Sequence, residues 1–183
     1  MLVESLEIAD VKLLTPKRFS DPRGFFSEVY NARLFAEAGI NETFVQDNQS
    51  LSAPVYTLRG LHFQKPPRAQ AKLVRVVRGR ILDVAVDLRR ISPTYGRHVR
   101  TELSADNWRQ LLVPVGFAHA FLTLEPNTEV IYKVTDFYAP ECDAGVLWSD
   151  PDLAIKWPAP ADQIVLSDKD ARLSLLKDLP HIF

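Results

Sequence analysis

The sequence predicts an all-β protein, an antiparallel sandwich or barrel with a few short helices, and three observations support this class. Thirteen prolines and seven glycines are spread along the whole chain and divide it into short pieces. Much of the second half alternates apolar and polar residues with a period of two, as strands with one buried face do. Turn signals separate these segments at close spacing, which favours antiparallel connections over a parallel α/β sheet.

The first half of the chain is predicted to hold short strands and one helix. We expect strands at residues 11–14, 25–30 and 43–50, the second of them after a turn at residues 21–24. Asn31 can cap a helix that runs from Ala32 to about Ala38, and Gly39 is placed to end it. This is the one convincing helix in the first half.

The second half of the chain is predicted to be strands joined by turns. We expect strands at residues 73–77, 81–88, 98–103, 108–113, 117–124, 129–135 and 145–148, with turns at 92–96 and 104–107. Within residues 81–88, Asp83 falls on the same face as Ile81 and Ala85. Ser167 and Asp170 have the spacing of a helix cap near the C-terminus.

Length and composition indicate an ordinary globular protein. The 183 residues suffice for a single domain, residues 1–183, with a sizeable core. Hydrophobic residues make up 46% and charged residues 25%, and the net charge of −1 gives no pull toward nucleic acid or an anionic membrane. Lone Cys142 excludes an intrachain disulfide. Because neither a signal peptide nor a membrane span is recognisable, we expect a cytoplasmic protein.

One stretch near the middle of the chain gathers groups that can do chemistry. In an extended chain His62 and Gln64 share one face, because successive side chains point to opposite faces. By the same rule Lys72 lies on the face of Val74 and Val76. A lysine that points inward needs a partner or a substrate charge. Alternatively, Lys72 lies at the mouth of a strand with its ammonium in water, and the alternation alone leaves both possibilities open.

A second histidine follows a tight turn at the start of a predicted strand. Pro114, Gly116 and His119 form the pattern Pro-x-Gly-x-x-His, which resembles half of the cupin signature and agrees with a jelly roll. The other half normally supplies two more histidines and a glutamate as metal ligands, but only His62 stands in that region. Because catalytic metal sites usually offer three protein ligands, we expect neither a metal centre nor another cofactor.

Without a metal, the candidate residues suggest proton chemistry. A histidine with a pKa of about 6.5 is the natural general base at neutral pH. A lysine beside it can stabilise the oxyanion that forms when a carbon next to a carbonyl loses its proton. Tyr132, in a predicted strand, can return a proton to the other face. From spacing alone, however, a core aromatic with a hydrogen-bonded hydroxyl is the favoured interpretation of Tyr132.

Several motifs that occur in order carry a family resemblance. They are Asp21-x-Arg-Gly-x-Phe-x-Glu28, Arg59-Gly-Leu-His62, Ala69-Gln-Ala-Lys72, Asp87-Leu-Arg-Arg-Ile-Ser-Pro-Thr94, Pro114-x-Gly-Phe-Ala-His119, Tyr132-Lys-Val-Thr-Asp-x-Tyr138, Trp148-Ser-Asp-Pro-Asp152 and Leu166-Ser-Asp-Lys-Asp170. Together they resemble the dTDP-4-dehydrorhamnose 3,5-epimerase family, over nearly the whole chain. Any one of these motifs is weak evidence for the family, but so many motifs in the same order are specific evidence for it.

The resemblance implies a metal-free cupin-type jelly roll that works as a homodimer. Its members convert dTDP-4-dehydro-6-deoxy-D-glucose to dTDP-4-dehydro-L-rhamnose by inverting C3 and C5, which flank the C4 ketone. By this resemblance His62 is the base, and Asp170 accepts a hydrogen bond from its far nitrogen. Lys72 holds the enolate charge at the C4 oxygen, and Tyr132 delivers a proton from the opposite face. Asp170 can also serve as the helix cap.

The resemblance further implies a set of substrate contacts. Arg23, Arg59 and His119 would line the diphosphate and sugar, Glu28, Gln46, Asp47 and Asn48 would contact the nucleotide portion, Tyr138 would stack on the thymine with Lys169 nearby, and Asp143 falls where the family often has glutamate. Asp143 would therefore make a shorter or water-bridged contact. The plain alternative for each charged residue is a solvated surface group.

Three other functions compete with a 3,5-epimerase. A single-carbon epimerase acting at C3 or C5 of a related deoxysugar nucleotide would use the same fold and chemistry. A metal-dependent cupin would bind iron, manganese or zinc. A non-catalytic module would bind the dTDP-sugar without exchanging its protons with solvent, and it would leave the grouping of the four candidate catalytic residues without a purpose.

Overall fold

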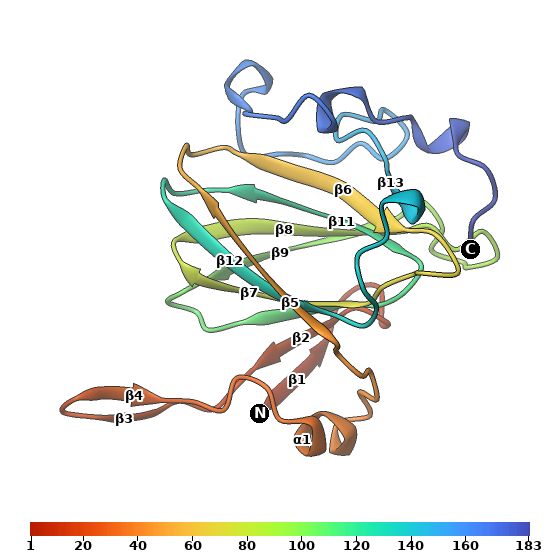
Figure 1. Ribbon diagram of the computed structural model, residues 1–183. Coiled ribbons are helices and arrows are strands. Elements are labelled where there is room, and N and C mark those ends of the chain that lie inside the picture. The colour runs from red at the N-terminus through yellow and green to blue at the C-terminus, as the bar shows by residue number, and fades with distance from the viewer.

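The structure, a computed structural model, describes all 183 residues and is built from two facing antiparallel sheets (Figure 1). The six-stranded sheet has the order β1 (Leu2–Ser5), β2 (Lys12–Thr15), β10 (Gln110–Val113), β7 (Lys72–Arg78), β12 (Thr128–Val134), β5 (Gln46–Ser52). The five-stranded sheet has the order β13 (Asp143–Gly145), β6 (Leu58–Gln64), β11 (Phe117–Thr123), β8 (Arg80–Asp87), β9 (His98–Ser104). This is the antiparallel jelly roll with few helices that the sequence predicts.

The remaining elements are short. A two-stranded hairpin joins β3 (Phe19–Asp21) to β4 (Gly24–Phe26) and extends away from the two sheets (Figure 1). One α-helix, α1 (Ala32–Glu37), lies below the six-stranded sheet. Four 3-10 turns complete the chain, η1 (Pro140–Cys142), η2 (Ala161–Gln163), η3 (Asp170–Arg172) and η4 (Leu176–Asp178). None of these helices has the length and apolar character needed to cross a membrane.

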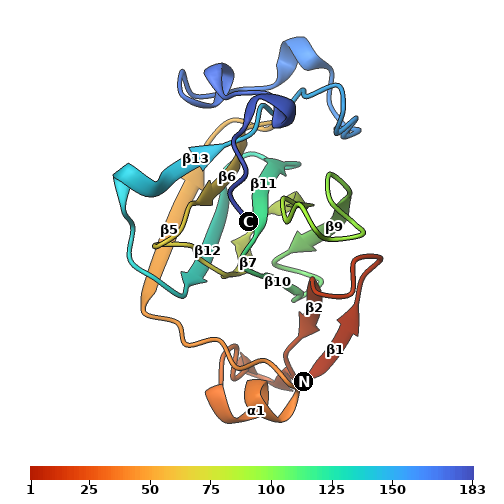
Figure 2. The ribbon, with the colours of Figure 1, turned by 90° about the vertical axis from the view of Figure 1, so that its right-hand side faces the viewer.

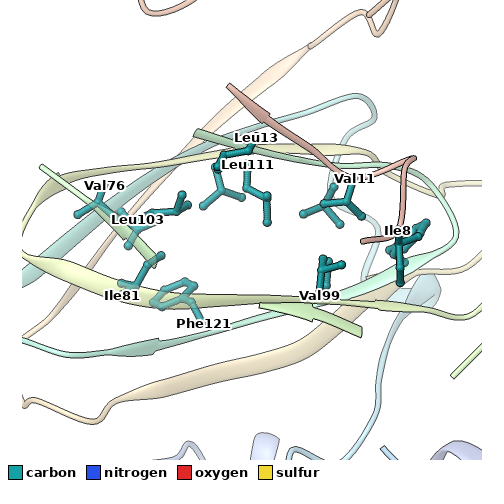
Figure 3. Packing of buried hydrophobic residues seen from close by; sticks show 14 residues of the cluster. Ile8, Val11, Leu13, Val76, Ile81, Val99, Leu103, Leu111 and Phe121 are labelled. Carbon is teal, nitrogen blue, oxygen red and sulfur yellow. The ribbon is translucent and has the colours of Figure 1, made fainter. Parts of the chain in front are cut away.

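The main core lies between the two sheets (Figure 3). Val74, Val76 and Leu111 face it from the six-stranded sheet, and Ile81 and Phe121 face it from the five-stranded sheet. Two sheets pack in this way because each has one apolar face that is stable only when buried against another layer. The same alternation that produces this core directs Lys72, at one end of β7, toward the space between the sheets.

The C-terminal segment, residues 146–183, covers the outer face of the five-stranded sheet (Figures 1 and 2). Leu61, Phe63 and Val84 point outward from this sheet and pack against Leu153 and Leu176 of the segment. The five-stranded sheet is thus buried on both faces, and this explains why every residue of β11 is buried. It also brings the residues around η3 close to the start of β6.

The predicted helix is confirmed with its cap. The side-chain oxygen of Asn31 accepts hydrogen bonds from the amides of Arg33 and Leu34 at 3.1 and 3.3 Å. Gly39 follows the helix with a φ of 78°, a conformation that glycine adopts without strain. Phe35 anchors α1 against the outer face of the six-stranded sheet.

Several predicted boundaries are wrong. The segment predicted at 43–50 pairs only from Gln46, and the one predicted at 108–113 pairs only from Gln110, because the backbone of Trp108 turns with a φ of 62°. Strand pairing after the turn at 21–24 ends at Phe26, not residue 30. The strand predicted at 145–148 lies at Asp143–Gly145 instead, where β6 offers its free edge.

Candidate active site

Two adjoining cavities open between the sheets. The main cavity, of about 400 Å³, is lined by residues that include His62, Lys72, His119, Tyr132 and Asp170. The side cavity, of about 310 Å³, is lined by residues that include Gln46, Asn48, Gln64, Tyr138 and Asp143. His62, Lys72, Tyr132 and Lys169 line both, so the two cavities form one continuous site.

His62 on β6 is held by Asp170 of η3. Nε2 of His62 lies 2.5 Å from Oδ1 of Asp170, whose side chain is 5% exposed. Burial alone would raise the pKa of Asp170, but the hydrogen bonds from His62 and from the Gly60 amide outweigh it and hold that pKa below its usual value. An ionised Asp170 accepts the Nε2 proton, so the lone pair of a neutral His62 resides on Nδ1.

Ser167 holds the turn that carries Asp170, and Asp170 itself is not the cap of this turn. The amide of Asp170 donates to the hydroxyl of Ser167 at 3.1 Å, as the Ser-x-x-Asp spacing predicts. The turn is only the three residues of η3, and it holds the Asp170 carboxylate beside the imidazole of His62. Ser167 therefore holds the amide of Asp170, while the carboxylate of Asp170 contacts the histidine.

Glycine is required where His62 and its neighbours meet β11. Gly60 has a φ of 123°, and a Cβ placed on it would lie 2.5 Å from the carbonyl oxygen of His119. The pairing of β6 with β11 shifts register at this point, between His119 and Phe121. Only a residue without a side chain permits this close approach. As a result, Arg59 and His62 both line the main cavity.

Lys72 on β7 points inward, which decides between the two orientations left open by the alternation. It is only 8% exposed, and its ammonium donates to the carbonyl oxygen of His62 at 3.2 Å. Burial lowers the pKa of Lys72 from 10.5 to about 8, while the charges of Asp83 and Asp143 raise it and that of Lys169 lowers it further. Most of the Lys72 side chains therefore remain charged at neutral pH and lie beside the histidine.

Tyr132 comes from the opposite sheet to His62. It lies on β12, paired with Val74 of β7 and with Asn48 of β5. Its ring packs partly against the main core, while the side chain lines both cavities. Burial raises the pKa of the phenol, so Tyr132 holds its proton at neutral pH and can act as a proton donor.

His119 on β11 forms a second imidazole–carboxylate pair. Its Nε2 lies 2.9 Å from Oδ1 of Asp83, and both residues are buried. His119 lines the main cavity together with Arg59, whose guanidinium donates to the hydroxyl of Ser52 at 3.1 Å. The main cavity therefore presents two imidazoles and three further basic side chains, Arg59, Lys72 and Lys169, a suitable surface for an anionic substrate.

The side cavity contains an exposed aromatic ring beside a set of amides. Tyr138 is 58% exposed, its amide donates to the side chain of Gln46 at 3.3 Å, and its hydroxyl donates to Asp143 at 3.3 Å. Asp143 also pairs with Lys169. The amide of Gln46 donates in turn to Asn48 at 2.8 Å. An open aromatic face next to amide groups is a surface on which a planar heterocycle can stack.

Three residues named from the resemblance lie outside both cavities of the single chain. Arg23 pairs with Asp21 on the β3–β4 hairpin, and its side chain is 90% exposed. Glu28 lines a separate small hollow near α1. Asp47 points to the opposite face of β5 from Gln46 and Asn48, and it pairs with Lys133 at 2.8 Å. The other candidate residues line at least one of the two cavities.

Sequence reasoning missed two contributors to the site. Asp83 was recognisable, because a carboxylate on the apolar face of a predicted strand needs a partner. Gln64 donates to the carbonyl oxygens of Arg68 and Phe137 and accepts from the amide of Ala139 at 2.7 Å, so it braces the loop that carries Tyr138. Nothing local in the sequence predicts those contacts. No group of three or more His, Cys, Asp or Glu side chains is arranged to hold a metal ion.

The fold is that of a cupin-type jelly roll, and its main cavity brings together two imidazoles, a buried lysine and a tyrosine. The sequence model of the dTDP-4-dehydrorhamnose 3,5-epimerase family matches residues 5–178. The chain belongs to this family and is an isomerase. A relative of that name from Sinorhizobium fredii is 51% identical over 100% of this chain and 93% of its own length. A dTDP-4-dehydrorhamnose 3-epimerase from Streptomyces niveus is 38% identical, over 94% of this chain and 84% of its own.

Solved structures agree in fold over nearly the whole chain. The 3,5-epimerase from Bacillus anthracis, with TDP and PPi bound, is 53% identical and has a TM-score of 0.92, with 95% of this chain and 98% of that one covered. The 3,5-epimerase from Legionella pneumophila, in complex with dTDP-4-keto-L-rhamnose, is 43% identical and has a TM-score of 0.93, with 98% and 94% covered.

Proposed function

We propose that this protein inverts C3 and C5 of dTDP-4-dehydro-6-deoxy-D-glucose, giving dTDP-4-dehydro-L-rhamnose for dTDP-L-rhamnose or other deoxysugar biosynthesis. One observation carries the proposal: His62 and Tyr132 line the same cavity from opposite sheets, with the Lys72 ammonium in the same cavity. The relatives named for this activity and the Legionella structure with dTDP-4-keto-L-rhamnose support the choice of substrate.

The chemistry follows from the acidity of carbons next to a ketone. His62 takes the proton from C3 or C5, and its pairing with Asp170 stabilises the imidazolium that forms. The electrons move into the carbonyl, and the Lys72 ammonium stabilises the enolate oxygen at C4. Tyr132 then donates its proton to the same carbon from the opposite face. Removal from one face and return to the other inverts the centre.

Nucleotide binding is assigned to the remaining cavity residues. We assign the thymine to the exposed ring of Tyr138, with Gln46 and Asn48 at its edge. Arg59 and His119 are assigned to the diphosphate and sugar, since a guanidinium fork suits phosphate oxygens. Lys169, which lines both cavities, pairs with Asp143 of the side cavity. The Bacillus structure with TDP and PPi bound supports a site for this ligand class.

We assign Arg23 and Glu28 to the site of a second copy in a homodimer, with Asp47 at its edge. The β3–β4 hairpin extends away from the body of the chain, and it exposes Phe19, Phe25 and Phe26 by 50%, 50% and 66%. Exposed aromatic side chains on a projecting hairpin favour burial against a partner. Sedimentation equilibrium tests this, and a chain that remains monomeric at micromolar concentration would remove Arg23 and Glu28 from the proposal.

The single-carbon epimerase is the second candidate, because the Streptomyces niveus relative is named for inversion at C3 alone. The deciding experiment incubates the purified protein with dTDP-4-dehydro-6-deoxy-D-glucose in D₂O and follows the sugar by NMR. Deuterium at both C3 and C5 supports the proposal. Deuterium at one carbon supports the single-carbon enzyme, and tight dTDP binding without exchange supports a binding module. Metal analysis of the same sample tests the metal-dependent cupin.

A further inference from the structure

We propose that Asp83 is a positioning residue of this site: its buried carboxylate orients His119 and supplies the counter-charge that lets Lys72 act as an ammonium inside the cavity. The inference rests on the proposed function, because the ammonium of Lys72 matters through the enolate that it stabilises. Asp83 itself does not touch the cavity and acts through these two neighbours.

Asp83 occupies a costly place for a carboxylate. It lies in the middle of β8, paired with Phe121 of β11 and with Thr101 of β9, and it is completely buried. Ile81 and Ala85, on the same face of β8, belong to the apolar core between the sheets. Such burial disfavours a charge unless compensating groups surround it, so a carboxylate at this position needs a reason.

The hydrogen bonds of Asp83 are incomplete, unlike those of the other buried carboxylates. Asp87, Asp150 and Asp170 each accept hydrogen bonds at both oxygens. Asp83 accepts one hydrogen bond, from His119, and its Oδ2 is buried without a partner. The only other buried side-chain atom without a partner is the hydroxyl oxygen of Ser50, a residue that lines the main cavity. Both unpaired atoms therefore belong to residues at the same site.

Asp83 and Asp143 are the two carboxylates whose charges raise the pKa of Lys72, and only Asp143 has a cationic partner. The titratable groups that face Lys72 across the two cavities, or act on it through space, are Arg59, His62, Asp83, His119, Tyr132, Tyr138, Asp143, Lys169 and Asp170. Asp143 is neutralised by its ion pair with Lys169, whereas the partner of Asp170, like that of Asp83, is an imidazole. The only partner of Asp83 is an imidazole, which is neutral when it merely donates Nε2–H.

No ion pair joins Lys72 to Asp83, and this arrangement suits the role of Asp83 as a counter-charge. Lys72 donates to the carbonyl oxygen of His62, and the ion pair of Asp83 is with His119 instead. The carboxylate therefore favours the charged form of Lys72 through space without holding its ammonium in a direct salt bridge. The protons of the ammonium stay available for an oxygen that gains charge during the reaction.

The Asp83→Asn variant tests the charge of Asp83 separately from its hydrogen bond to His119. The asparagine oxygen can still accept the Nε2–H of His119, so the imidazole keeps its orientation while the negative charge is lost. Without that charge the pKa of Lys72 falls below its value of about 8. The ammonium is then lost at a lower pH, and the exchange of substrate protons with solvent fails earlier as pH rises.

The experiment measures the rate of deuterium exchange at C3 against pH for the wild type, Asp83→Asn and Asp87→Asn. Asp87 is an equally buried carboxylate on the same strand, but it binds Arg89, Ser92 and Thr94 and lines neither cavity. For Asp83→Asn we expect the basic limb of the profile to move down by about one pH unit, which slows exchange at pH 8 about fivefold. Asp87→Asn should keep the wild-type profile even if its melting temperature falls.

A folded Asp83→Asn variant with a wild-type basic limb would overturn the inference. If this variant does not fold, Asp83→Glu carries the test, because it keeps the charge but displaces it. For Asp83→Glu the inference requires two results. The basic limb must lie within a few tenths of a pH unit of the wild-type limb, and kcat must be lower than in the wild type. If either result is not found, the inference is contradicted. ¹⁵N NMR titration of the Lys72 ammonium needs no substrate. If the wild type exchanges neither the C3 nor the C5 proton of the substrate, this titration still tests whether Asp83 raises the pKa of Lys72.

Discussion

Nε2 of His62 and Oδ1 of Asp170 lie 2.5 Å apart although 108 residues separate them in the chain. We expect Asp170→Asn to slow exchange at C3 and C5 by roughly 100- to 1,000-fold, because an amide stabilises the imidazolium far less than a carboxylate does. The measurement is the initial exchange rate in D₂O, with dTDP affinity by calorimetry as the control. Exchange within threefold of the wild type would show that proton removal does not depend on the charge of Asp170.

His62→Ala should abolish exchange at both carbons, because no other group in the assigned geometry takes the proton. The affinity for dTDP should stay within a few-fold, since the base binds no phosphate. Isotope exchange by NMR and calorimetry on the same preparation separate these two effects. Exchange that persists at C5 alone would mean that a second base serves that carbon.

Tyr132→Phe should spare the loss of the proton but suppress inversion. The substitution removes the hydroxyl and keeps the ring, which packs partly against the core, so the fold should be retained. Washout of label from C5 reports proton loss, and the configuration of recovered sugar reports inversion. If the phenylalanine variant inverts C5 at the wild-type rate, Tyr132 is not the acid.

The wild-type activity should fall as pH rises through about 8. Burial lowers the pKa of Lys72 from 10.5 to about 8, and the ammonium is the form that stabilises the enolate. Activity that depends on the ammonium is therefore complete well below pH 8 and is lost above it. The pH dependence of kcat locates this limb. Lys72→Gln should reduce kcat at every pH and abolish the limb, and a limb that persists in this variant would assign it to another group.

Asp87 should stabilise the fold except in strong acid. Burial raises the pKa of Asp87, but hydrogen bonds from Arg89, Ser92 and Thr94 outweigh this and bring it from 3.8 down to about 2. Because the folded pKa lies below the unfolded one, the stabilisation is present above pH 4 and is lost as pH falls toward 2. Asp87→Asn should lower the free energy of unfolding by about 3 kcal/mol at pH 7 and by less at pH 3.

Urea denaturation at the two pH values measures this difference. Asp106→Asn provides a control, because Asp106 is an almost fully exposed carboxylate that makes only a long contact with Arg80, 3.9 Å away. It should change stability by less than about 0.5 kcal/mol at either pH. An equal loss for Asp87→Asn at pH 7 and at pH 3 would mean that packing, not charge, accounts for the effect.

The sequence alone predicted what depends on neighbours along the chain. Alternation with a period of two identified most strands and placed Lys72 on the face of Val74 and Val76, because side chains on a strand must point to opposite faces. It left open whether the ammonium of Lys72 is buried or in water, and the structure decided this. The Asn31 cap and Gly39 placed the helix, since capping involves only residues within one turn. The motif order indicated the family that the comparisons confirm.

Only the tertiary structure decided which of these residues meet. The C-terminal segment folds over the five-stranded sheet and brings Asp170 to His62, and strands from both sheets enclose the cavity around Lys72 and Tyr132. The family resemblance implied the contact of Asp170 with His62, but the unpaired oxygen of Asp83 and the hairpin that holds Arg23 away from the cavity were outside sequence reasoning. Alternation sets the face on which a side chain lies, but long-range pairing and packing set its partner. The site is formed by such partners.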